Sequence, residues 1–174
     1  ALFRPVAMGY PDKDLIAEVY MRAEGFYSAR ELARKTVLLF SLSKQMLTPQ
    51  RIYDFGLRAL KAVLHTGGKL LLEAKQLSNT IDQPLSTKKE SELLIKAIRI
   101  NTLSKLTAED TTRFLELIRD VFPGVTSEDI EGGTLEQMIR EVISSHDMVV
   151  DEKQIKKMLQ LKEALDQRIG CVII

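Results

Sequence analysis

Apolar residues recur every three or four positions along most of this chain, which is the spacing of one face of an α-helix. The first two predicted helices run from 12 to 24, with Asp12 as the cap, and from 28 to 47, with Gly25 as the stop between them. Their predicted apolar faces are Leu15, Ile16, Val19 and Ala23 in the first, and Ala29, Ala33, Val37 and Phe40 in the second.

A third helix is predicted in the stretch YDFGLRALKAVL, residues 53–64, which continues the apolar pattern. Thr48 and Pro49 resemble a cap followed by a first helical residue, and Asp54 is placed to cap the quoted stretch. The apolar stripe consists of Leu57, Leu60, Leu64 and Leu71. The pair at 67–68 is Gly-Gly, so a kink or an end there is also possible.

The second half of the chain predicts four more helices. Residues 75–87 are polar and aperiodic, which is typical of a loop. Beyond them, the spacing of a capping box precedes each of four periodic runs. The four boxes are Thr87–Glu90, Thr107–Asp110, Thr134–Gln137 and Asp151–Gln154. We therefore expect an all-α fold.

Only the two ends are β-prone, in the segments LFRPVAM and GCVII. Two short strands alone make a marginal sheet in water, so we expect each end to be the stub of a sheet formed with strands outside this sequence. The alternative is that the ends are disordered or tuck into the core.

Composition excludes several classes of function. The 174 residues carry a net charge of +1, which predicts neither nucleic-acid binding nor adhesion to an anionic membrane. No apolar run approaches the roughly 20 residues that span a bilayer. The single cysteine, Cys171, cannot form an internal disulfide. The start Ala1-Leu2-Phe3, without methionine, suggests a piece of a longer chain.

No catalytic apparatus is visible in the sequence. Asp54-Phe55-Gly56 matches a short kinase motif, but no glycine-rich phosphate loop or catalytic loop accompanies it. His65 and His146 have no metal-ligand partners at suitable spacing. Paired acids such as Glu109 and Asp110 are explained by the favourable interaction of negative charge with a helix start.

Arg58 has two interpretations. Counted from a cap at Asp54 it is the fourth helical residue, where a cation faces the positive end of the helix dipole. It belongs either to a solvated stripe with Lys61, His65 and Lys69, or to an anion site in which a phosphate meets both the guanidinium and the helix start.

Several motifs, in order, resemble the dynein heavy chain. They are ALFRPVAM, PDKDLIAEV, EGF, YDFGLRALKAVL and RDVFPGV. The resemblance covers essentially the whole chain and corresponds to the end of the first AAA+ module and the start of the second. MLTPQ, KAIRINTLSKL and RIGCVII resemble the cytoplasmic dynein 2 (intraflagellar transport) subclass more than axonemal or conventional cytoplasmic dyneins.

The resemblance implies a division of the chain into five segments, with the missing phosphate loop just after Ile174. They are a strand stub of the first large subdomain (1–9), the helical lid of the first module (10–77), a loop (78–87), linker helices to the second module (88–168) and a second strand stub (169–174).

The resemblance also implies roles for individual residues. Arg58 matches the sensor II arginine, which reaches from the lid to the γ-phosphate of ATP. Leu57 and Ile16 are candidates to line an adenine pocket, and core packing is the alternative use of both. Arg4 matches the arginine-finger position; the alternative is a solvent-exposed or salt-bridging arginine.

The function implied is that of a lid and connector in an ATP-hydrolysing microtubule motor. Mg-ATP would be the cofactor of the parent protein, while the isolated chain is expected to bind none. Implied partners are neighbouring AAA+ modules, microtubules and dynein accessory chains, in the cytoplasm, cytoskeleton and cilium. The alternative is a helical adaptor that never meets nucleotide, and the sequence beyond residue 174 would distinguish the two.

Overall fold

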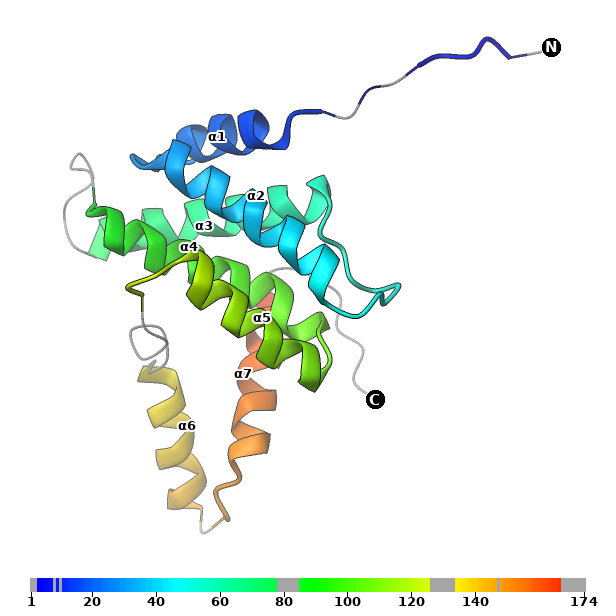
Figure 1. The fold of residues 1–174 in the computed structure, drawn as a ribbon. Coiled ribbons are helices and arrows are strands. Elements are labelled where there is room, and N and C mark those ends of the chain that lie inside the picture. The colour runs from blue at the N-terminus through cyan, green and yellow to red at the C-terminus, as the bar shows by residue number, and fades with distance from the viewer. Residues whose placement is uncertain are drawn as a thin grey trace.

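The computed structural model describes residues 3–7, 9, 11–77, 85–125, 134–146 and 148–166. These residues form α-helices, one short 3₁₀ helix and no strand, so the predicted all-α class is confirmed for them (Figure 1). The helices are α1 (Lys13–Ala23), α2 (Ala29–Met46), α3 (Leu57–Leu77), α4 (Thr87–Thr102), η1 (Leu103–Lys105), α5 (Ala108–Val121), α6 (Thr134–Ser145) and α7 (Glu152–Asp166).

Helices α1 to α5 form one body around a shared apolar core. Helix α3 packs against α4 and α1, and α2 packs against α1 and α5 (Figure 1). The largest fully buried side chains of the body are Met21, Leu32, Leu39, Leu60, Leu64, Leu71, Leu94, Ile95, Ile98, Phe114 and Phe122. The core therefore draws on both halves of the chain, and α4 and α5 pack onto the three preceding helices. The division predicted at 78–87 stays a prediction, and residues 78–84 lie outside the described part.

The predicted apolar face of α1 is wrong. Ala17 and Met21 are fully buried, whereas Leu15 and Val19 are 60% and 58% exposed and Ala23 is exposed too. Helix α1 carries apolar residues on more than one side, so periodicity alone does not select the side that packs. The small Ala17 and the flexible Met21 allow close approach to the neighbouring helices.

The stripe predicted for α3 is confirmed, because Leu60, Leu64 and Leu71 are buried. The helix does not end at Gly67 and Gly68, which are themselves buried within it. A Cβ on Gly67 would lie 3.3 Å from the Phe26 ring, and one on Gly68 only 2.8 Å from the Glu24 Cβ. The two glycines therefore let α3 lie close to the end of α1.

Several predicted helix starts are confirmed. The Asp12 side chain accepts hydrogen bonds from the amides of Asp14 and Leu15, and the Thr107 hydroxyl accepts one from the amide of Asp110. The Asp151 carboxylate accepts a hydrogen bond from the Lys153 amide at 2.9 Å, next to the first residue of α7. The side chain of Thr134 lies outside the described part.

Three other predicted starts are wrong. Residues 48–50 are not helical, so Thr48 and Pro49 do not begin a helix. The cap of α4 is Ser86 rather than Thr87, since its hydroxyl accepts a hydrogen bond from the Lys89 amide. Asp54 lies before α3 and accepts a hydrogen bond from the Gly56 amide at 2.8 Å, which is a turn rather than a helix cap.

The strand predicted at the start of the chain is not formed in residues 3–7 and 9, which lead away from the helices as an extended tail (Figure 1). A strand needs a neighbour to satisfy its backbone groups, and none of the described residues supplies one. Residues 169–174 lie outside the described part. Among the described helices, none has the length and apolarity that a membrane span requires.

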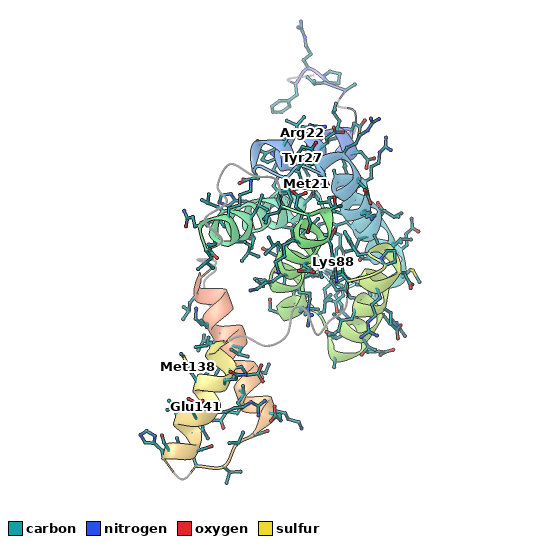
Figure 2. All side chains as sticks on the ribbon, turned by 90° about the vertical axis from the view of Figure 1, so that its left-hand side faces the viewer. Met21, Arg22, Tyr27, Lys88, Met138 and Glu141 are labelled. Carbon is teal, nitrogen blue, oxygen red and sulfur yellow. The ribbon has the colours of Figure 1, made fainter. Side chains whose placement is uncertain are left out.

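Helices α6 and α7 form a separate hairpin beside the body (Figures 1 and 2). Among its described side chains, Ile143 and Ile155 are the buried apolar ones. Arg140 joins the two helices by donating to Glu136 in its own helix and to Glu152 in α7, both at 2.7 Å. These two carboxylates raise the already high pKa of Arg140 further.

Candidate functional site

Arg58 is the second residue of α3. The amide of Leu60 donates to the Gly56 carbonyl at 3.1 Å, which makes Gly56 the cap position and places Arg58 nearer the helix start than its predicted fourth position. Its side chain is exposed and has no hydrogen-bond or ion-pair partner among the described residues. The helix start and the guanidinium together form a surface suited to an anion.

Other basic groups on the same face of α3 are partnered by α1 and by the residue that follows it. The Lys61 ammonium lies 5.2 Å from the centre of the Tyr20 ring, and the His65 Nδ1 lies 3.1 Å from a carboxylate oxygen of Glu24. The predicted stripe is therefore exposed but only partly solvated. Lys69, further along the helix, is exposed like Arg58 and has no partner among the described residues.

The other predicted site residues are spread over three parts of the chain. Leu57 is half-buried and packs against the shared core, which supports its alternative use. Ile16 is half-buried on α1. Arg4 is exposed in the extended tail. None of these three residues, nor Arg58, lines the cavity described next.

A small cavity of about 140 Å³ lies next to the start of α3. Its lining includes Lys13 from α1, Phe40 and Lys44 from α2, and Phe55 and Gly56 from the segment before α3. Ligand pockets typically have about 300–1,000 Å³. This cavity is therefore too small to enclose a nucleotide, which would need a further wall.

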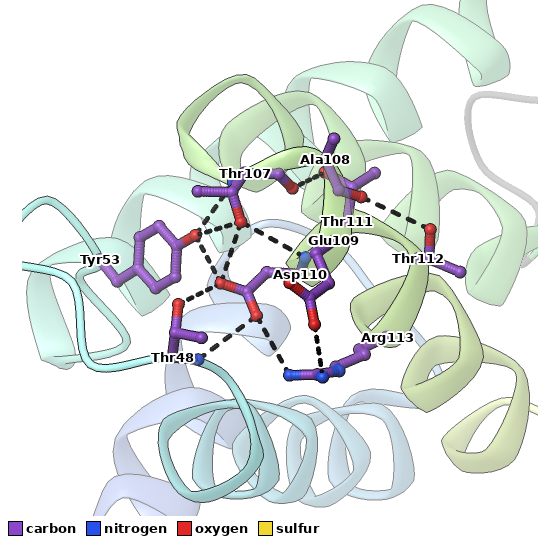
Figure 3. A network of polar contacts seen from close by, with 9 residues as sticks. All are labelled: Thr48, Tyr53, Thr107, Ala108, Glu109, Asp110, Thr111, Thr112 and Arg113. Carbon is purple, nitrogen blue, oxygen red and sulfur yellow. Dashed lines mark hydrogen bonds and ion pairs between the residues drawn. The ribbon is translucent and has the colours of Figure 1, made fainter.

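The segment that leads into α3 is fastened to α5 by the buried carboxylate of Asp110 (Figure 3). Asp110 accepts hydrogen bonds from the Thr48 amide at 3.3 Å, the Thr48 hydroxyl, and the Tyr53 hydroxyl at 2.8 Å. The Tyr53 hydroxyl also accepts a hydrogen bond from the Thr107 amide at 2.9 Å. The two ends of the segment 48–53 thus meet the first turn of α5.

The hydrogen bond from the Thr48 hydroxyl is the largest influence on the pKa of Asp110, and burial acts against it. Together with the hydrogen bonds from Tyr53, the Thr48 amide and Thr107, it lowers the pKa to about 2 from an ordinary 3.8. Arg113 lies 3.9 Å from the same carboxylate. Asp110 is therefore ionised at neutral pH and accepts hydrogen bonds with its full negative charge.

Aromatic packing fixes the rest of the segment. The Phe55 ring lies 5.8 Å from that of Phe40 in α2, 6.3 Å from that of Phe114 in α5 and 6.3 Å from that of Tyr53. Phe55 comes three residues before Arg58. The start of α3 is consequently held by α2 and α5 on one side while Arg58 faces outward.

Sequence reasoning did not find the tertiary roles of two first-turn acids. In a reciprocal capping box, the acid would return to the amide of Thr107, but Tyr53 occupies that amide and Asp110 reaches the segment before α3. Glu90 is also buried, and it accepts the amides of Tyr27 and Ser28 at 2.8 and 2.9 Å. An acid in the first turn of a helix indicates a cap. The neighbouring sequence does not show which distant residue such an acid will bind.

No cluster of three or more His, Cys, Asp and Glu side chains suited to a metal ion occurs among the described residues. At the start of α3, the Arg58 guanidinium and the first helix amides both present positive charge to an anion.

Comparison with known proteins gives the family. A family described as the hydrolytic ATP binding site of the dynein motor region matches residues 1–174. The chain belongs to this dynein motor family. Over 173 residues, it is 50% identical to cytoplasmic dynein 2 heavy chain 1 of Tripneustes gratilla and 46% identical to that of Homo sapiens, in each case 99% of this chain. Identity to dynein axonemal heavy chain 11 of Sus scrofa is 36% over the whole chain.

The resemblance to dynein heavy chains, and in particular to cytoplasmic dynein 2, is thereby confirmed. The chain spans only about 4% of the length of these relatives. What a whole heavy chain does therefore enters below as a proposal about this chain.

Proposed function

We propose that this chain is the nucleotide-sensing lid and inter-module connector of a dynein-family motor ATPase. Arg58 carries the proposal: an exposed guanidinium, without a partner among the described residues, stands at the second position of a helix whose start is held by α2 and α5. In this function it contacts the γ-phosphate of ATP bound by other parts of the same polypeptide. The dynein motor family supports a nucleotide role over the adaptor alternative.

The physical basis is the match between guanidinium and phosphate. Arginine offers five N–H donors in a planar arrangement that meets two phosphate oxygens at once, and the first amides of α3 add positive potential. A contact to the γ-phosphate exists only before hydrolysis and release of that group. The orientation of the lid then depends on the nucleotide state.

ATP and Mg²⁺ belong, in this proposal, to the parent heavy chain. The cavity beside the start of α3 is too small to enclose a nucleotide, which supports a lid that covers a nucleotide held elsewhere. Neighbouring modules are the immediate partners. As part of the same proposal, the parent heavy chain would act with microtubules and dynein accessory chains in the cytoplasm, cytoskeleton and cilium.

The decisive experiment is Arg58→Ala in the complete motor heavy chain. Loss of a charged hydrogen bond worth about 1.5–3 kcal/mol is expected to lower kcat/KM for ATP by at least about tenfold. Arg58→Lys is expected to recover only part of the rate, because an ammonium group does not bind two oxygens in one plane.

Lys69→Ala is the matched control, since Lys69 is an exposed cation on the same helix, far from its start. It is expected to leave ATP turnover unchanged. Equal rates for Arg58→Ala and the unaltered motor would contradict the sensor role, and equal losses in both variants would indicate a nonspecific effect of removing charge from α3.

A second experiment concerns the chain by itself. Calorimetric titration of the 174-residue chain with Mg-ATP is expected to show no affinity tighter than millimolar, because the lid alone provides one wall of the site. A micromolar dissociation constant would mean that the chain contains a nucleotide site of its own.

A further inference from the structure

The attachment of α5 to the segment before α3 has a consequence for Arg58. We infer that Asp110 is a positioning residue, which fixes the start of α3 so that Arg58 is presented to the phosphate in one orientation. The inference rests on the proposed function of Arg58 and extends it to a residue of a different helix. Asp110 itself touches no nucleotide in this arrangement.

The geometry supplies a short mechanical path. Asp110 binds Tyr53, and the Tyr53 ring packs against Phe55 with 6.3 Å between ring centres. The amide of Gly56 is held by Asp54, and the Gly56 carbonyl accepts the first hydrogen bond of α3 from Leu60. Arg58 lies within this turn, so displacement of Tyr53 moves the helix start that carries the guanidinium.

Asp110 is more than a cap of its own helix. It is fully buried, and three of the groups that donate to it belong to Thr48 and Tyr53, more than 50 residues away in sequence. A residue needed only to start α5 would have required the hydrogen bond with Thr107 alone. The additional donors identify the attached segment as what Asp110 orders.

Glu90 provides an internal comparison. It is likewise a fully buried carboxylate in the first turn of a helix, and it likewise holds a distant helix start, accepting the amides of Tyr27 and Ser28 just before α2. Replacing either acid by its amide removes a buried charge from a similar setting. Of these two acids, Asp110 is the one that holds the segment before Arg58.

Hydrogen exchange of the 174-residue chain tests the positioning without nucleotide. Asp110→Asn is expected to speed exchange of the Gly56 and Leu60 amides, whose hydrogen bonds define the start of α3. Glu90→Gln is expected to speed exchange instead at Leu32, which donates to Ser28 at 3.1 Å. Unchanged protection at Gly56 and Leu60 in Asp110→Asn would overturn the inference.

Steady-state kinetics of the complete motor test its functional part. Asp110→Asn is expected to lower kcat/KM for ATP by about fivefold in the unaltered background. In the Arg58→Ala background the expected loss is less than about twofold, because both changes disable the same contact of Arg58 with the phosphate. Glu90→Gln is expected to leave the rate unchanged. Equal factors in the two backgrounds would show that Asp110 acts independently of Arg58 and would overturn the inference.

Tyr53→Phe is the milder variant if Asp110→Asn proves too unstable to study. It removes the hydroxyl between Asp110 and Thr107 but keeps the ring against Phe55. The same selective exchange at Gly56 and Leu60 is expected. Should Arg58→Ala leave ATP turnover unaffected, the proposed sensor role fails, while the exchange experiment still decides whether Asp110 orders the start of α3.

Discussion

The helical body α1–α5 and the hairpin α6–α7 have similar apolar patterns but bury them to different degrees. In the body, long apolar side chains such as Leu64 and Phe114 are fully enclosed. In the hairpin, Ile143 and Ile155 are buried, whereas Met138 and Val142 remain more than half exposed. Amphipathic periodicity thus forms helices in both regions, but only the body places a third and fourth helix over the apolar face.

The comparison predicts two levels of stability within one chain. The body has the enclosed core of an independent folding unit, while the hairpin depends on one apolar contact region and the ion pairs of Arg140. A two-helix hairpin of this size opens locally at lower free energy than a packed core.

The largest expected effect is that of Phe114→Ala. Phe114 is fully buried at the junction of α5 with the segment before α3, so its truncation is expected to cost about 3–5 kcal/mol of the free energy of unfolding of the body. Urea denaturation followed by circular dichroism measures this loss. A cost below about 1 kcal/mol would mean that the core relaxes around the site far more than usual.

Ile155→Ala is the corresponding change in the hairpin. It is expected to weaken α6–α7 by about 2 kcal/mol while the main unfolding transition of the body stays in place. Hydrogen exchange resolved by residue separates the two regions. If the body transition falls together with the hairpin, the two regions form one cooperative unit and the comparison fails.

Gly68→Ala tests how closely α3 packs within the body. The new Cβ would meet the Glu24 side chain at less than 3 Å, and this overpacking, about 1–3 kcal/mol, exceeds the gain of about 1 kcal/mol from helix propensity. A net loss of about 1 kcal/mol in thermal unfolding is expected. Gly67→Ala, whose Cβ would lie 3.3 Å from the Phe26 ring tip, is the matched control and is expected to cost less.

The last prediction concerns the stability of the body in acid. Because the folded-state pKa of Asp110 is lowered to about 2, its contribution to stability is complete above pH 3.8 and is lost as the pH falls through about 2. Urea unfolding at a series of pH values should show a shallower decline between pH 4 and 2 in Asp110→Asn than in the unaltered chain. Identical slopes would show that the carboxylate is not preferentially ionised in the folded state.

Much of the fold was predictable because helix signals are local. The cap at Asp12, the cap at Thr107 and the leucine stripe of α3 each depend on residues within a single helix or beside its start, and the structure confirms them. The false start at Thr48 has the same origin, since a threonine before a proline satisfies the local rule while its donors are used by Asp110.

The candidate site likewise contains a residue that the sequence could identify and residues that it could not. Arg58 was identified from its place in a motif; it is exposed, as both of its interpretations predict, and its role is a proposal. Asp110 and Tyr53 were not identified, because the contact between them joins positions 57 residues apart.

The sequence by itself determined the helical class of this chain, several helix boundaries, the family and the candidate guanidinium. Tertiary structure alone decided which side of α1 is buried, that α4 and α5 complete the core, and that a carboxylate of α5 holds the start of α3. The physical reason is range: caps and periodicity act within a few residues, whereas burial and the partners of a buried charge depend on segments brought together only by packing.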